Sequence, residues 1–248
     1  MELQPADSSL FRSAIESLKD FLPEGQLFIT PKGLTISGMD ASHVGFVSYT
    51  LAAEDCAVLK VPVPLTLGVP LAILSRVLSS ASENVTLKST DTHLIVSCNS
   101  DKFKKKSTAE VPLLTIDAES VSIPDQDYTA SIQARTADVA AVCKDVAAFG
   151  DTLSFMLDEE GFHISSKSEM GSMTQMLENT EDREMTLHSA LTRPVLFGTK
   201  YITNMLKCGI SPTMSLDFTT DTPMRIMYKY GHASSLLFYL APKIPDEN

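Results

Sequence analysis

The side chains that most often perform catalysis or bind metals are scattered along this sequence. The five histidines are isolated from one another, and the four cysteines are far apart, without a Cys-x-x-Cys pair. Zinc sites and redox pairs usually require closely spaced thiols, so we interpret these cysteines as buried and reduced. The residues in question are His43, His93, His163, His188, His232, Cys56, Cys98, Cys143 and Cys208.

One acidic cluster, Asp158-Glu159-Glu160, has the residue types of a metal site. Gly161 follows it directly, which is typical of a tight turn, so we expect a solvated hairpin turn rather than a metal-binding group. The sequence also lacks a phosphate-binding glycine loop, a nucleophile elbow and a His-Glu-x-x-His motif. These patterns predict a protein that is not an enzyme and that holds no metal or cofactor, although an enzyme built from residues distant in sequence stays open.

The charge balance restricts the possible partners. The chain has 20 Lys+Arg against 31 Asp+Glu, a formal net charge of −11. Phosphate binding requires local positive charge, so a nucleic-acid-binding protein of this composition must gather its cations on one face. No apolar run approaches the roughly 18 residues of a membrane helix, and the acidic, polar start lacks the features of a secretory signal. We expect no membrane partner.

The elements that would position these groups occur twice. Leu18-Lys19-Asp20 recurs as Cys143-Lys144-Asp145, and Gly33-Leu34-Thr35-Ile36-Ser37 recurs as Gly161-Phe162-His163-Ile164-Ser165. Thr90-Asp91-Thr92 recurs as Thr220-Asp221-Thr222, and the three matches keep their order along the chain. We interpret this pattern as an internal duplication.

Four segments have the apolar spacing of a helix with one buried face. They are Ser9–Leu22, Pro70–Ser80, Ala137–Phe149 and Thr199–Cys208. Ser8 or Ser9 is a candidate cap for the first helix, Pro23 a candidate stop, and Pro70 suits a first helical turn. Alternating runs between the helices predict strands, so each half is expected to be α+β, with helices on one face of mostly antiparallel sheets.

Each predicted helix carries at least one cation opposite its apolar face. These cations are Arg12, Lys19, Arg76, Lys144, Lys200 and Lys207. Helices commonly expose lysine and arginine, and Glu16 and Asp145 lie close to this face, so ordinary solvated helix surfaces remain an alternative. If the helices line a ring, the cations would meet DNA phosphates without reading bases, and such contacts permit sliding.

Longer segments resemble the eukaryotic proliferating cell nuclear antigen family of DNA sliding clamps. Gly38-Met39-Asp40-Ala41-Ser42-His43-Val44 is similar to a Met-Asp-x-Ser-His-Val segment of that family, and Ile123-Pro124-Asp125-Gln126-Asp127-Tyr128 to the end of its interdomain connector. Lys144 to Asp151 is similar to its third helix, and the ending Tyr239-Leu240-Ala241-Pro242-Lys243-Ile244-Pro245 to its tail. The resemblance runs in order through nearly the whole chain.

The resemblance implies two clamp domains, at 1–116 and 128–248, joined by a connector at 117–127. It implies a head-to-tail homotrimeric ring in the nucleus, with helices lining the hole and sheets outside. An ATP-driven loader would open the ring around double-stranded DNA, bound without sequence preference. The ring would then tether DNA polymerases, ligases, nucleases and repair factors as a processivity factor for replication and repair.

The resemblance also implies two protein-binding surfaces. Partner peptides with one aliphatic and two aromatic side chains would enter a pocket beneath the connector, at Met39, His43, Val44, Val121, Ile123, Pro124, Pro223, Tyr239, Leu240, Ala241 and Pro242. Without the resemblance, Met39, Val44 and Leu240 are better explained as ordinary core. The subunit joint would pair an edge strand near Ala109–Asp117 with one near Ser172–Glu178, and its apolar candidates are Leu113, Leu114, Met173 and Met176.

Several positions depart from the family pattern. Pro112 falls in the expected joint strand, where it must avoid a pairing position or weaken the joint. Ser13 and Ser79 stand where the family often has lysine, and Glu159 stands where many relatives have the ubiquitin-acceptor lysine. The run from Lys102 to Lys106 is a further departure, which we interpret as a solvated loop, a nuclear import patch or an added DNA contact.

Two other functions stay open at this point. One is a subunit of a heterotrimeric checkpoint clamp, which would share the fold. The other is a protein-interaction scaffold that never encircles DNA.

Overall fold

A computed structural model describes residues 1–79, 83–100, 102, 104–116 and 126–244. It divides into two compact units, Met1–Val121 with Lys229–Leu236, and Ser122–Tyr228 with Leu237–Asn248. Most of the predicted connector at 117–127 lies outside the described residues, so the proposed boundaries stay a prediction. No pattern in the amino-acid sequence indicated that residues 229–236 would group with the first unit.

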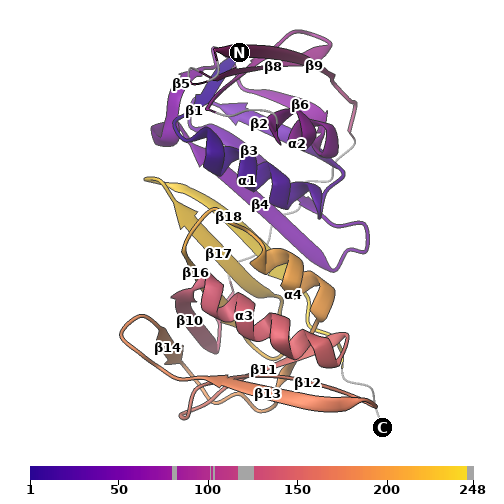
Figure 1. Ribbon diagram of the computed structural model, residues 1–248, viewed down its shortest axis with the longest axis vertical. Helices are drawn as coiled ribbons and strands as arrows, with labels where there is room; N and C mark the ends of the chain where they lie inside the picture. The colour runs from indigo at the N-terminus through magenta and orange to yellow at the C-terminus, as the bar shows by residue number, and fades with distance from the viewer. Residues whose placement is uncertain (80–82, 101, 103, 117–125, 245–248) are drawn as a thin grey trace. The chain divides into compact units, whose positions relative to one another are not determined.

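The two halves of the chain contain the same succession of elements (Figure 1). In the first half these are β1 (Glu2–Pro5), α1 (Ser8–Lys19), β2 (Glu24–Thr30), β3 (Gly33–Met39), β4 (Gly45–Ala52), β5 (Cys56–Lys60), β6 (Leu65–Pro70), α2 (Leu71–Ser79), β7 (Asn84–Ser89), β8 (His93–Ser100) and β9 (Lys105–Pro112). In the second half they are β10 (Ala130–Arg135), α3 (Thr136–Val146), β11 (Thr152–Leu157), β12 (Phe162–Ser168), β13 (Gly171–Leu177), β14 (Glu184–Leu187), β15 (Val195–Gly198), α4 (Thr199–Leu206), β16 (Thr213–Phe218), β17 (Met224–Tyr230) and β18 (Ser234–Leu240).

The strand pairing repeats in the same way. The order β5-β1-β7-β8-β9 corresponds to β14-β10-β16-β17-β18, and β6-β2-β3-β4 corresponds to β15-β11-β12-β13. The strands pair in antiparallel fashion, as β1 does with β5, β8 with β9, β10 with β16 and β12 with β13. In the first unit α1 packs against α2, and in the second α3 packs against α4 (Figure 1). The predicted duplication and the α+β class are therefore confirmed. None of the helices in the described ranges is both long and apolar enough to cross a bilayer.

The helix ends differ from the predicted ones in informative ways. Asp7, not Ser8 or Ser9, caps α1, because its carboxylate accepts hydrogen bonds from the backbone N–H groups of Ser9 at 2.8 Å and Leu10 at 2.9 Å. The helix ends at Lys19, well before Pro23, so the proline does not set its end. Pro70 is the last residue of β6 rather than part of α2.

The cores of the two units are filled differently. In the second unit Phe155 is fully buried, with ring centroids of Phe162 at 5.2 Å, Phe197 at 5.4 Å and Phe218 at 6.1 Å. In the first unit the fully buried rings of Phe11 and Tyr49 lie farther apart, with centroids at 6.3 Å. Much of the remaining core is aliphatic, and its fully buried side chains include Leu3, Leu18, Leu27, Leu74, Leu87 and Val96. Both halves therefore bury one face of each helix, but with different side chains.

The first unit also contains a buried carboxylate that the sequence did not reveal. Asp55 accepts hydrogen bonds from the backbone N–H groups of His232 at 2.7 Å, and of Ala233 and Ser234 at 3.1 Å, and from the Ser234 hydroxyl at 2.6 Å. Burial alone would raise the pKa of Asp55, but these four donors outweigh it and lower the pKa. Gly231, with φ of 60°, lets the chain approach this carboxylate.

Candidate DNA-contacting and partner-binding surfaces

The cations on the first helix pair interact with their own surroundings. The Lys19 ammonium lies 2.7 Å from the Glu16 carboxylate, one turn back on α1, and the Ser75 hydroxyl of α2 also donates to Glu16. The hydrogen bond to Glu16 is the main cause that raises the pKa of Lys19, and the pKa of Glu16 is lowered mainly by Lys19. Arg12 donates to the Ser9 hydroxyl at 3.4 Å, and Arg76 is exposed on α2. This face is therefore cationic but partly neutralised.

The lysines on the second helix pair are more available than Lys19. Lys144 on α3 and Lys200 on α4 are exposed, and in the described ranges neither forms an ion pair. Lys207 is exposed just beyond the end of α4, where its ammonium donates to the Asn204 side-chain oxygen at 3.1 Å. Within each unit, the predicted cations therefore lie on or beside the helix pair. Whether these groups contact DNA stays a prediction.

The loop after β3 is organised by Asp40. Its carboxylate accepts hydrogen bonds from the backbone N–H groups of Ser42 at 3.1 Å, Val44 at 2.8 Å and Gly45 at 2.6 Å. These bonds hold His43 exposed at a positive φ of 54°, with Val44 half-buried beside it. Asp40 was not among the predicted pocket residues, although a short acidic side chain before a tight loop is a recognisable turn signal.

The other predicted pocket residues are distributed as follows. Met39 is half-buried at the end of β3, and Leu240 is fully buried at the end of β18. Four more are half-buried: Pro223, Tyr239, Ala241 and Pro242. Val121, Ile123 and Pro124 lie outside the described residues. A common pocket therefore stays a prediction, and Leu240 contributes to core packing in any case.

The predicted joint strands are both edge strands. β9 is the last strand of its sheet beside β8, and β13 is the last strand of its sheet beside β12. β9 begins four residues earlier than predicted, at Lys105, so Lys105 and Lys106 belong to a strand and not to a solvated loop. Pairing with β8 extends this strand into a basic segment that its composition alone would leave as a loop.

The four apolar joint candidates differ in their surroundings, and whether they meet between two copies stays a prediction. Met173 is half-buried on the helix-covered face of β13, whereas Met176 is 40 % exposed on the opposite face. Leu114 already pairs with Gly68 of β6, where its N–H donates to the Gly68 carbonyl at 2.9 Å, and Leu113 is half-buried beside it. The backbone comes so close at Gly68 that a Cβ would lie 2.2 Å from the Leu114 carbonyl oxygen, which requires glycine.

Asp158 forms the predicted hairpin turn. Its carboxylate accepts from the backbone N–H groups of Glu160 at 2.9 Å and Gly161 at 3.2 Å, and lies 3.1 Å from His163 Nε2. Gly161 adopts a φ of 151°, which explains the glycine. Cys98, Cys143 and Cys208 are buried and unbridged, and Cys56 is half-buried. Within the described ranges no group of three or more His, Cys, Asp or Glu residues is arranged to hold a metal.

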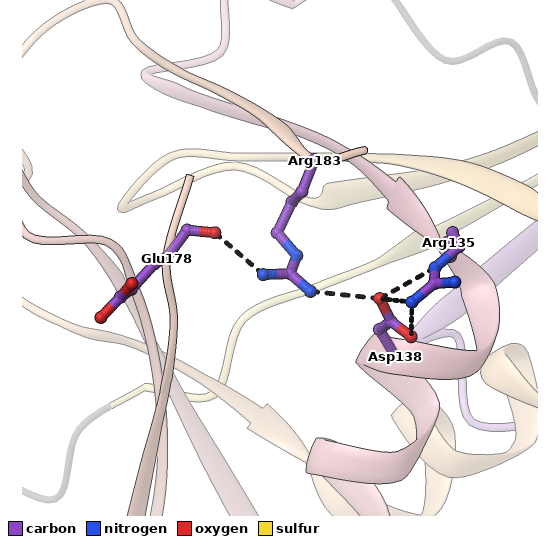
Figure 2. Close-up of polar contacts among 4 residues, drawn as sticks. All are labelled: Arg135, Asp138, Glu178 and Arg183. Carbon is purple, nitrogen blue, oxygen red and sulfur yellow. Dashed lines mark hydrogen bonds and ion pairs between the residues drawn. The ribbon is translucent and has the colours of Figure 1, made fainter. Parts of the chain in front are cut away.

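An arginine cluster beside α3 was not foreseen. Arg183 donates to the Asp138 carboxylate at 3.1 Å and to the main-chain carbonyl of Glu178 at 2.8 Å (Figure 2). Arg135 also binds Asp138, at 3.1 Å. Arg183 thereby fixes the loop between β13 and β14 to the first turn of α3. The contact joins residues 45 positions apart, a separation that periodicity cannot detect.

Comparison with known families agrees with this architecture. The N-terminal domain family of proliferating cell nuclear antigen matches residues 1–121, and the C-terminal domain family matches residues 122–243. The chain belongs to the proliferating cell nuclear antigen family. The resemblance drawn from the sequence is therefore confirmed, and membership supports a role as a DNA sliding clamp that acts in replication and repair. The family is a non-enzymatic one, in agreement with the scattered reactive side chains.

Proposed function

We propose that this chain assembles with two further copies into a head-to-tail ring that encircles duplex DNA in the nucleus. The observation that carries this proposal is the match of both clamp domains to successive halves of a chain with duplicated topology. Each unit presents one helix pair whose cations lie on the side facing away from the core of that unit. Contacts between such cations and phosphates carry no sequence information, so the ring would hold DNA without stopping at particular bases.

The gain for replication would be mechanical. A polymerase that binds the ring weakly stays near its template, because a topological link raises its effective concentration there. Ligases, nucleases and repair factors would use the same surface, and a clamp loader would open the ring. No catalytic group in this chain takes part in these steps.

The first test is the mass of the assembly. A ring of three copies has a mass of about 81 kDa, three times the 27.0 kDa chain. Sedimentation of the purified protein alone should give this value at micromolar concentration. A persistent monomer that forms a ring only when mixed with two other clamp subunits would instead indicate a heterotrimeric checkpoint clamp.

The second test concerns the tethering of partners. A synthetic peptide with one aliphatic and two aromatic side chains should bind to the unmodified chain. The double variant Met39→Ala/Tyr239→Ala should weaken this binding at least about tenfold, because both side chains are expected to line the pocket. Val63→Ala, which alters an exposed apolar side chain elsewhere, is the matched control. Equal affinity for all three proteins would remove the proposed pocket while leaving the ring intact.

A further inference from the structure

The lysine run at the start of β9 lies at an open sheet edge. Alternate residues of an edge strand direct their N–H and C=O groups outward, where they can pair with another strand. The Leu113 N–H donates to the Thr92 carbonyl at 2.9 Å, and the register with β8 is continuous. The backbone N–H and C=O groups of the odd-numbered residues of β9 are therefore directed toward β8. Lys106, Thr108 and Glu110 therefore direct their backbone groups outward.

Pro112 has the same outward parity. Because proline has no N–H, the donor that it removes belongs to the open edge and not to the ladder with β8. The open edge of β9 accordingly offers three backbone donors, at Lys106, Thr108 and Glu110, before it ends at Pro112.

The open edge of β13 can be worked out in the same way. Asp158 N–H donates to the Gly161 carbonyl at 3.2 Å, and the registers of β11 with β12 and of β12 with β13 are continuous. The backbone groups of the odd-numbered residues of β13 are thus directed toward β12, whereas those of Ser172, Thr174 and Met176 are directed outward. This edge also offers three donors.

One antiparallel register gives all six of these backbone donors a hydrogen-bond acceptor on the opposite edge. It places Lys106 opposite Met176, Thr108 opposite Thr174, and Glu110 opposite Ser172. Pro112 then lies opposite Met170, beyond the end of β13, where its missing N–H removes no bond. Side chains of 106, 108, 110 and of 172, 174, 176 all lie on the more exposed faces of their strands, so the helix-covered faces of both sheets also coincide.

Charge favours the same arrangement. The first edge begins with four exposed lysines, Lys102, Lys104, Lys105 and Lys106. The second edge leads into four exposed acids, Glu178, Glu181, Asp182 and Glu184. Among the described residues, Lys104, Lys105 and Lys106 form no ion pair, and neither do these four acids. Antiparallel pairing brings the two groups to the same end of the joint, because Lys104 lies in the turn just before β9 and Glu178 directly follows β13. Parallel pairing would place the lysines beside Gly171 and Ser172.

The position of Glu178 suits this role. Arg183 holds its main-chain carbonyl, and the Glu178 carboxylate points away from the guanidinium (Figure 2). Arg183 itself is engaged by Asp138, so it does not neutralise the acidic segment. The carboxylate is therefore held on a fixed backbone while remaining exposed to an incoming cation.

We propose that the Lys102–Lys106 segment of one copy binds the acidic segment at 178–184 of a second copy, and that this charge pairing sets the antiparallel register of β9 on β13. The inference rests on the proposed ring and adds to it the groups that select its joint. In a chain of net charge −11, which repels its own copies at long range, this segment supplies the local attraction.

A charge-swap experiment tests the pairing. Lys104→Glu and Glu178→Lys should each weaken association by about fivefold per joint, because an attraction becomes a repulsion. The double variant should return the trimer dissociation constant to within about threefold of the unmodified chain, since it restores opposite charges. Lys229→Glu, on the outer face of β17, is the control with the same change in charge. Sedimentation equilibrium at about 50 mM and 500 mM salt measures all four, and the unmodified trimer should weaken at the higher salt.

A cross-linking experiment tests the register. Thr108→Cys should form a disulfide between copies with Thr174→Cys on mixing under mild oxidation, because opposed residues of a ladder have Cα atoms about 5.5 Å apart. Neither Ser172→Cys nor Met176→Cys should form this disulfide with Thr108→Cys efficiently, since either pair would require the strand register to shift by two residues.

The outcomes separate this inference from the proposed ring. If the unmodified chain forms no trimer, the ring and the inference both fail. A trimer whose stability ignores Lys104→Glu and Glu178→Lys overturns the inference alone, and the lysines then only keep an edge strand soluble. Preferential cross-linking through Ser172→Cys or Met176→Cys overturns the register.

Discussion

In the first unit Lys19 lies 2.7 Å from Glu16, whereas in the second unit Lys144 and Lys200 are exposed and, among the described residues, form no ion pair. The two helix pairs occupy equivalent places in duplicated halves, so the difference comes from side chains and not from topology. A lysine that already binds a carboxylate must exchange partners before it binds a phosphate. The duplication therefore preserves the scaffold while the second half provides the more available lysines.

The cores differ as well. Three phenylalanines surround Phe155 in the second unit, whereas the first unit has the buried pair Phe11 and Tyr49 and many aliphatic side chains. Two halves can thus keep the same strand order with different packing, because the alternation of buried and exposed positions sets the order and the side-chain volumes fill the space.

The largest effect is expected from the aromatic core. Phe155→Ala should lower the free energy of unfolding by about 3–5 kcal/mol, because it leaves a cavity between three rings. Leu87→Ala in the first unit should cost about 2–5 kcal/mol, and Phe155→Leu less than either. Denaturant unfolding followed by circular dichroism measures these values. A loss below about 1 kcal/mol for Phe155→Ala would show that the cluster does not organise the second unit.

The next effect concerns the helix cations. Lys144→Ala and Lys19→Ala each remove one positive charge, so a difference between them isolates direct phosphate contact. Lys144→Ala should reduce the slope of log affinity against log salt by about 0.9, and Lys19→Ala by clearly less. Fluorescence anisotropy with a short linear duplex, onto which a ring can thread, gives both slopes. Equal slopes would show that Lys19 and Lys144 contribute equally to phosphate binding, which contradicts the proposed difference between the helix pairs.

A separate effect, on stability, is expected at the buried carboxylate. Asp55→Asn should destabilise the chain by about 1.5–3 kcal/mol at pH 7, because hydrogen bonds to a charged acceptor are lost. Asp55 has a lowered pKa in the folded chain, so its contribution is present above the unfolded pKa of about 3.9 and disappears as pH falls through the folded value. The difference between the two proteins should therefore shrink below about pH 4. Unfolding curves at several pH values measure it, with a constant difference as the contrary result.

The smallest effect is expected on duplex affinity when the acidic partner of Lys19 is removed. Glu16→Gln should release Lys19 for phosphate binding and increase duplex affinity by about twofold, since a weak, partly exposed ion pair is removed. The same anisotropy titration detects it. Unchanged affinity would indicate that Lys19 lies away from the DNA even when it is free of Glu16.

Periodicity predicted the four helices and the presence of strands between them, but it does not mark every strand. β6 contains Gly68 and ends at Pro70, and β15 has four residues, so neither presents a clear alternation. The resemblance placed the joint strand near Ala109–Asp117, whereas β9 spans Lys105–Pro112. Lysines are unusual in a strand, and only pairing with β8 explains them. Contacts between distant residues, such as Arg183 with Asp138 and Asp55 with Ser234, left no local signal.

The candidate sites divide in the same manner. Cations on helix faces follow from spacing, and their approximate exposure could be predicted. Their ion pairs could not, because Ser75 reaches Glu16 from another helix. The pocket residues came from family resemblance, and no periodic pattern indicates them.

The encircling of DNA is tested most directly by topology. The purified chain is placed on a nicked circular plasmid by a clamp loader with ATP, separated from free protein, and the plasmid is then cut once. A ring should remain on the circle and be lost from the linear molecule by sliding off its ends. Equal loss from both forms, or equal retention on both, would contradict the sliding clamp and leave a scaffold that does not encircle DNA.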